Sequence, residues 1–227
     1  MDAFKRLRDV LETAKTDEKG RLRLPSERDL SELLSMQRTL VREQLATLEN
    51  LGFVQRVRGS GTFLQMPQPA FVQIYFDIAL RLGFISVDAL EAAREMLERE
   101  IAYCAAHNAT DADIAKLEEY LVEMGNPNVH ESLAADYDFH RHLAYMTRNP
   151  VIILIIQGLA SVLKEVVHRR RVLVRQSRQS MSKTNDTHQA VIDALKNRDP
   201  DAAKDAMNIH FRIWDEESKG LLEWIKE

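Results

Sequence analysis

Residues 24–64 contain the pattern that most constrains the fold, namely two short helical segments, a tight turn between them and a glycine-containing hairpin. Pro25 ends the segment before the first helix, and Ser26 is a good N-cap because its hydroxyl can accept from the backbone N–H of Asp29. The second helix is expected from about residue 36 until Gly52 ends it. Its buried stripe is predicted to be Leu40, Val41, Leu45, Leu48 and Leu51. This order predicts a helix-turn-helix.

The hairpin that follows predicts a wing. Strand-like runs at 53–58 and 62–64 flank Gly59-Ser60-Gly61, a tip small enough to approach a minor groove closely. Arg38, Thr39 and Arg42 lie on the polar face of the second helix, near the N-terminal end that meets base edges and phosphates in a major groove. An arginine on a helix surface usually serves only solubility, but the three elements together predict a winged helix-turn-helix that docks on DNA.

The run Pro25-Ser26-Glu27-Arg28-Asp29-Leu30, followed by Arg38-Thr39-Leu40-Val41-Arg42-Glu43 and by Arg58-Gly59-Ser60-Gly61-Thr62-Phe63, resembles the DNA-binding half of the GntR family of bacterial transcriptional regulators. The match covers 24–64 without a gap. Met36, Gln37, Leu40 and Gln44 depart from the family pattern, and Gln37 is expected to shift the operator sequence by contacting adenine rather than to abolish binding. The resemblance implies that the DNA-binding residues are Arg28, Gln37, Arg38, Thr39, Arg42, Arg58, Gly59, Ser60 and Gly61.

Charge and length indicate two domains. Residues 1–65 carry 12 Lys and Arg against 10 Asp and Glu, while residues 66–227 carry 19 against 25, so the basic surface is small and N-terminal. Two prolines in Met66-Pro67-Gln68-Pro69 indicate a semi-rigid linker. We therefore expect a DNA-binding domain at 1–65, a linker at 66–72 and an effector domain at 73–227. With one cysteine, no transmembrane-length apolar run and no signal peptide, the chain is expected in the cytoplasm without a membrane partner.

From residue 71 the chain is almost free of glycine and follows a helical period, which predicts an all-α bundle, so that the whole chain is mainly α with a small β-wing. Asp111, Asn149 and Asp199 are expected to cap helix starts. Met96, Met124, Met146 and Met207 are expected in the core. The helices are predicted at 71–83, 86–108, 110–124, 130–147, 149–178, 183–197 and 200–225.

One group of residues in this bundle suits a divalent metal. Asp136 and His140 lie four residues apart on one helix face, and His188 and His210 lie on two later helices joined by a short turn. A single helical histidine is seldom a metal ligand, and His107, His130, His142 and His168 are interpreted as surface or packing residues. The spacing favours a metal site at Asp136, His140, His188 and His210.

The same residues resemble the FCD effector domain of FadR-type members of the GntR family. The matching runs are Asp136-Tyr137-Asp138-Phe139-His140, Thr187-His188, Met207-Asn208-Ile209-His210 and Arg94-Glu95-Met96-Leu97-Glu98. The resemblance implies a homodimer with a divalent ion, with zinc favoured and nickel or manganese as alternatives. Asp plus three His leaves one or two positions open on an octahedral ion, and a small carboxylate effector, such as a sugar acid, hydroxy acid or dicarboxylate, is expected to occupy them; the alternative is a purely structural metal. Arg94 would bind this carboxylate, and its alternative role is an ion pair with Glu98.

Two other functions compete with an effector-responsive regulator of operator DNA. A metal-dependent, hydrolase-like enzyme would use the same Asp/His site to activate water, but the spacing selects no general base between Glu98 and Asp138. A DNA-binding architectural protein would leave the Asp/His group unexplained. The arginines at 169–171, 175 and 178 are expected to be solvated or to face a dimer partner, with effector binding by one of them as the alternative.

Overall fold

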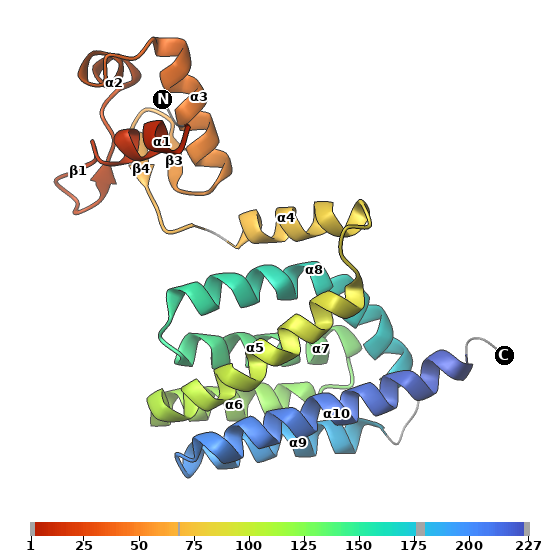
Figure 1. Ribbon diagram of the computed structural model, residues 1–227. Helices are drawn as coiled ribbons and strands as arrows, with labels where there is room; N and C mark the ends of the chain where they lie inside the picture. Colours follow the sequence, from red (N-terminus) through yellow and green to blue (C-terminus); the bar gives the residue numbers. More distant parts are fainter. Residues whose placement is uncertain (1–2, 68, 176–179, 225–227) are drawn as a thin grey trace. The chain divides into compact units, whose positions relative to one another are not determined.

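The computed structural model describes the backbone of residues 3–67, 69–175 and 180–224, and the side chains of 5–67, 69–164 and 186–216. The chain divides into two compact units, Met1–Phe71 and Val72–Glu227 (Figure 1). The first contains α1 (Ala3–Leu11), α2 (Glu27–Leu33) and α3 (Arg38–Asn50). It also contains four short strands, β1 (Lys15–Thr16), β2 (Leu22–Arg23), β3 (Val54–Val57) and β4 (Gly61–Leu64). This is the expected winged helix-turn-helix.

The first unit is held together by a small core under α3. Ser26 caps α2 by accepting from the N–H of Asp29 at 3.2 Å, as predicted. Leu40 and Leu51 were expected on the buried stripe of α3, but both are only partly buried. Leu40 lies beside the row of buried residues that follows the helical period, and Leu51 comes after the end of α3 at Asn50. The core consists of Val10, Leu24, Leu30, Val41, Leu45, Leu48 and Val54.

The strands form one antiparallel sheet in the order β1-β2-β4-β3. The wing strands β3 and β4 pair with Arg56 opposite Thr62 and Val57 opposite Gly61. The β1–β2 hairpin was not predicted, since two-residue strands are too short to show an alternating pattern. Its loop is fixed by the Asp17 carboxylate, which accepts from the backbone N–H groups of Lys19 and Arg21.

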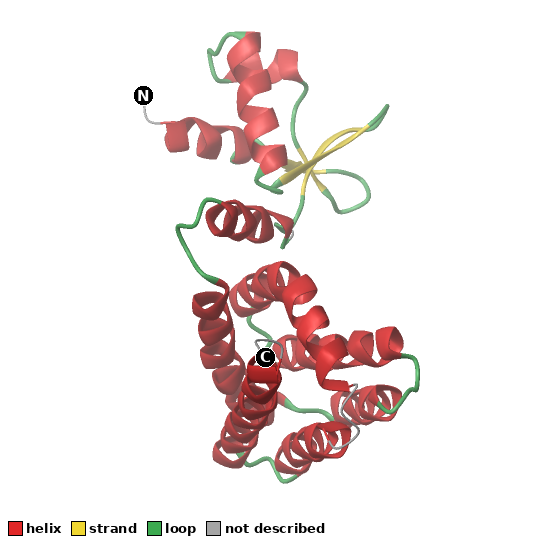
Figure 2. Ribbon diagram, turned by 90° about the vertical axis from the view of Figure 1, so that its right-hand side faces the viewer, coloured by secondary structure: helices red, strands yellow, loops and turns green. Residues whose placement is uncertain are grey.

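The described part of the second unit contains helices and no strand (Figure 2). Each predicted helix is present, with ends that differ from the predicted ones by a few residues. α4 begins at Ala70, inside the segment expected as linker, and Thr110 rather than Asp111 caps α6. The helices are α4 (Ala70–Arg81), α5 (Val87–Asn108), α6 (Asp111–Met124), α7 (Val129–Met146), α8 (Pro150–Arg175), α9 (Ser180–Lys196) and α10 (Pro200–Trp224).

The core of this unit lies between α5, α6, α7, α9 and α10, and α10 packs along both α9 and α5. Met124, Met146 and Met207 are buried as predicted. Met96 is 66% exposed, so its assignment to the core was wrong, because Leu97 rather than Met96 faces the core from that turn of α5. Among the described helices, none combines the length and the apolar character needed to cross a membrane.

Candidate functional site

The first turn of α3 presents its polar side chains to solvent. Gln37, Arg38 and Thr39 are all exposed. Gln37 occupies the N-cap position, but its side chain makes no capping hydrogen bond, as expected for a poor cap. Its amide is therefore not engaged by the start of the helix. An exposed amide and guanidinium at the N-terminus of this helix are the groups that a recognition helix needs for contacts with base edges.

Acidic side chains pair with two of the other arginines that are predicted to contact DNA, Arg42 and Arg28, and with the neighbouring Arg56. Arg42 donates from Nε to Glu27 at 2.6 Å, and this hydrogen bond raises the pKa of Arg42. Arg56 lies 3.7 Å from the other oxygen of Glu27, and Arg28 lies 3.9 Å from Glu32. Glu27 thus fixes the direction of two arginines, a role that the sequence analysis did not assign. Because Glu27 engages only Nε, the guanidinium of Arg42 keeps further N–H donors for the DNA contact that is predicted for it.

The wing tip depends on its glycines. Gly59 and Gly61 have φ of +74° and +125°, which side chains rarely adopt. A Cβ on Gly61 would lie 2.8 Å from Nε of Arg23, because β2 runs beside β4 and places this side chain against the tip. Arg21 on the same hairpin lies 4.0 Å from the ring of Phe63. Arg21 and Arg23 were not among the predicted contacts, because a two-residue strand leaves no alternating pattern to detect.

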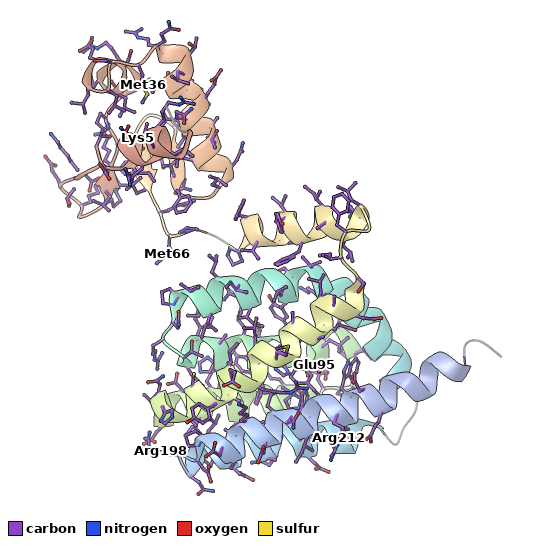
Figure 3. All side chains as sticks on the ribbon, in the orientation of Figure 1. Lys5, Met36, Met66, Glu95, Arg198 and Arg212 are labelled. Carbon is purple, nitrogen blue, oxygen red and sulfur yellow. The ribbon has the colours of Figure 1, made fainter. Side chains whose placement is uncertain are left out.

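The second unit gathers the predicted metal residues. His140 on α7, His188 on α9 and His210 on α10 are buried, and they offer ligand atoms that all lie within 4.8 Å of one another. Asp136 lies one turn before His140, with Oδ1 3.4 Å from Nε2 of His188. Figure 3 shows that side chains fill the space between the helices of this unit. Three helices distant in sequence thus place three imidazoles and a carboxylate together.

Other polar groups orient these imidazoles. Glu98 on α5 contacts Nδ1 of His140, and Thr187 Oγ1 lies 3.0 Å from Nδ1 of His210. Nε2 of His140 is buried, and it has no hydrogen-bond partner within the described part of the chain. A carboxylate on one ring nitrogen with the other left to an ion is the usual arrangement of a metal-bound histidine. The donor set fits zinc, nickel or manganese.

Glu98 also receives Arg94, so the ion pair considered as the alternative role of Arg94 is present. Burial raises the pKa of Glu98, but the charges and hydrogen bonds of Arg94 and His140 outweigh burial and lower it to about 2. Burial likewise lowers the pKa of Arg94, and Glu98 more than reverses this effect. Glu98 therefore stays ionised near neutral pH and joins Arg94 to the histidine cluster.

A cavity of about 500 Å³ lies beside the cluster, and both Arg94 and Asp136 line it. A smaller cavity of about 20 Å³ is lined by Arg94, Glu98 and His140. A group in the larger cavity can therefore reach the predicted effector residue and one predicted metal ligand. Asp138, one of the two bases nominated for the enzyme alternative, instead pairs with Arg141 at 2.9 Å.

The three other histidines whose side chains the structure describes do not join the cluster. His142 lies 3.3 Å from the Asp113 carboxylate, whereas His107 and His130 are exposed. The packing or surface role predicted for these three is consistent with their positions. The side chains of His168 and of the arginines at 169–171, 175 and 178 lie outside the described residues.

Each of the two units matches a known protein family. Residues 5–64 match the family model described as bacterial regulatory proteins of the gntR family, and residues 89–212 match the FCD domain. The chain resembles the structure of Streptococcus agalactiae GntR, with a TM-score of 0.61 and 23% identity, over 93% of this chain and 95% of that one.

Two curated relatives support the same assignment. The HTH-type transcriptional repressor NanR of Citrobacter rodentium is 32% identical, over 83% of this chain and 74% of NanR. The putative L-lactate dehydrogenase operon regulatory protein of Escherichia coli is 31% identical, over 84% and 75%. Both are named as regulators rather than enzymes. The chain therefore belongs to the GntR family, as a DNA-binding transcriptional regulator with an FCD domain.

Proposed function

We propose that this regulator is a homodimer that binds operator DNA in the cytoplasm and responds to a small carboxylate through a divalent ion in its FCD domain. The observation that carries the proposal is the cluster of His140, His188 and His210, with Asp136 beside it and a cavity alongside. Three imidazoles and one carboxylate leave coordination positions open on an octahedral ion. The proposed metal is zinc, with nickel or manganese as alternatives.

The charge of this site favours an anionic effector. A divalent ion with one coordinated carboxylate retains a net positive charge in a region from which water is largely excluded. Because Glu98 neutralises Arg94, this excess comes from the ion rather than from the arginine. The pair engages Nε of Arg94, and a guanidinium has further N–H donors with which Arg94 can bind the effector. We therefore keep Arg94 as the proposed effector-binding residue.

The names of the relatives narrow the proposal. One is named as regulating an L-lactate dehydrogenase operon, which favours a hydroxy acid within the effector classes considered. Another is named as a repressor, which favours repression as the mode of action. The DNA contacts proposed for this chain remain Arg28, Gln37, Arg38, Thr39, Arg42 and the wing residues 58–61.

An apolar stripe on α4 supports the dimer. One face of α4 packs through Phe76 and Leu80 on the core residues Leu90, Leu159 and Leu163. The other face and the residues after it expose Ile74, Tyr75, Ile78, Leu82 and Phe84, each between 51% and 79% exposed. At roughly 200 Å² for a large side chain, this α4 stripe presents about 600 Å² of apolar surface.

That area fits a second copy of the chain as the occupant. A stable interface covers about 800 Å² on each partner, so the α4 stripe supplies most of the surface needed. The two charged residues of α4, Asp77 and Arg81, pair with each other at 2.8 Å and leave the helix without net charge. Two copies related by a two-fold axis would therefore meet without electrostatic repulsion, and two-fold operators require dimers.

The metal is tested by elemental analysis and thermal melting of protein purified without chelator. We expect about one divalent ion per chain, and we expect His188→Ala or His210→Ala to lower both metal content and melting temperature because the site forms only on folding. His107→Ala, which removes an exposed histidine, is the control. Absence of metal in the parent, with no uptake of zinc, nickel or manganese, would contradict the proposal.

A further inference from the structure

The cavity beside the histidine cluster has a buried end and an open end. At the buried end, the side chains of Arg94 and Asp136 are 12% and 10% exposed. At the open end, Arg141 of α7 is 41% exposed and Lys164 of α8 is exposed. Apolar groups, including Ala160, make up much of the wall between them. A ligand that enters this cavity therefore passes two cations before it reaches the histidine cluster.

The two outer cations are arranged around one ring. The Tyr137 ring lies 5.5 Å from Nζ of Lys164 and 6.0 Å from the guanidinium carbon of Arg141. Arg141 pairs with Asp138, but Lys164 forms no ion pair with any described residue. The described outer wall thus carries two positive charges against the single carboxylate of Asp138. This local excess of positive charge attracts an anion.

The volume of the cavity indicates the size of its ligand. A cavity of about 500 Å³ is in the range that encloses whole metabolites rather than a two- or three-carbon acid. If the ion holds an acidic group of the ligand at the buried end, the far end of the ligand contacts the outer wall. With an uncharged far end, Lys164 would have no counter-charge among the residues that the structure describes.

We propose that the effector carries two acidic groups, one placed at the histidine cluster and Arg94 and the second placed at Lys164 and Arg141. The inference rests on the proposed function, because it assigns the first acidic group to the ion. It selects, among small carboxylates, those with a second carboxylate or a phosphate at the far end. Lys164 and Arg141 are then the residues that determine specificity for length and charge.

The test compares acids that differ only in the second group. Metal-loaded, full-length protein is titrated calorimetrically with malate against 2-hydroxybutyrate, and with 3-phosphoglycerate against glycerate. We expect the diacid of at least one pair to bind at least about tenfold more tightly than its partner. The first pair reports a carboxylate at the far end, and the second reports a phosphate. In Lys164→Met and Arg141→Met, this preference should fall about five- to tenfold, with the affinity for the monoacid unchanged.

Lys204→Met, which removes an exposed lysine of α10 paired with Glu100, should keep the preference of the parent. Equal affinity within both pairs would overturn the inference while leaving a monocarboxylate effector at the ion. A diacid preference that persists in both Lys164→Met and Arg141→Met would also overturn it. Binding of none of the four acids would contradict the proposed carboxylate response itself.

Discussion

Single residues account for the two chemistries proposed for this protein, DNA contact and metal coordination. In both sites, the side chain expected to bind is held by a neighbouring acid: Glu27 holds Arg42, and Glu98 contacts His140. In the proposed sites, these acids would orient the binding side chains without contacting DNA or the ion themselves. In both cases the acid can stay in place, because Arg42 keeps further N–H donors for DNA, and an ion would bind the other ring nitrogen of His140, Nε2.

Arg38→Ala and Arg42→Ala are expected to weaken operator binding about tenfold or more, since such contacts contribute roughly 1–3 kcal/mol each. The loss should be larger for Arg38, because Glu27 partly neutralises the charge of Arg42. Fluorescence anisotropy with DNA selected from a random pool provides the measurement, and Arg212→Ala, which removes an exposed arginine of α10, is the control. If both variants bind as tightly as the parent, the docking assignment is wrong.

Glu98→Gln is expected to lower metal affinity about 10- to 100-fold, the usual effect of removing a carboxylate that orients a metal-bound histidine. The change also leaves buried Arg94 without its counter-charge, so the melting temperature should fall even in metal-free protein. Glu95→Gln, on the same helix and paired with Arg99, is the control. Metal affinity in Glu98→Gln equal to that of the parent would remove Glu98 from the site.

At the scale of elements, one carboxylate joins the start of α6 to α7 and to the turn between α7 and α8. Thr110 and Asp113 form a capping box at the start of α6, and Asp113 also receives Arg148 at 2.8 Å and His142 at 3.3 Å. Burial raises the pKa of Asp113, but the hydrogen bonds from Thr110 and the charges of Arg148 and His142 outweigh burial, so the pKa is lowered. One side chain thus caps a helix and ties it to the α7–α8 turn.

A lowered pKa in the folded state means that the unfolded chain takes up the proton first as the pH falls. The contribution of Asp113 to stability is therefore complete above its ordinary pKa of 3.8 and is lost as the pH falls through its lower, folded-state pKa. Asp113→Asn should lower stability at pH 7 by about 1–2 kcal/mol and should weaken the acid dependence below pH 4. Urea midpoints from pH 3 to 7 test this, with exposed Asp111→Asn as control. An unchanged acid limb would contradict it.

At the scale of the whole molecule, the proposed homodimer depends on the α4 stripe. A charge on this stripe would be buried against apolar side chains in the interface, at a cost of several kcal/mol per ion. Ile78→Glu combined with Tyr75→Glu should therefore convert the dimer to a monomer and reduce operator affinity, while the helical circular dichroism signal stays unchanged.

Sedimentation equilibrium measures the mass of this double variant. Val122→Glu, which places a charge at an exposed apolar position of α6, is the matched control and should remain dimeric. A double variant that sediments as a dimer would show that α4 does not form the interface, and a monomeric parent would contradict the homodimer.

The sequence by itself determined most of the elements and the residues that are proposed for the two sites. Helical periodicity and capping groups are local, so the bundle helices, the Ser26 cap and the wing glycines were predicted correctly. The resemblance to two family patterns identified the regulator. The β1–β2 hairpin was not predicted, because two-residue strands leave no alternating period to detect. The exposure of Met96 was not predicted either, because it lies at a single position beside a buried stripe.

Only the tertiary structure decided which distant residues meet. Spacing along one helix allowed Arg94 to pair with Glu98, but the packing of α5 against α7 brought that pair to His140. The meeting of α7 with α8 likewise placed Lys164 beside Tyr137. The physical reason is that a helix fixes the direction of its own side chains within one or two turns, whereas contacts between helices depend on how all their apolar faces pack together.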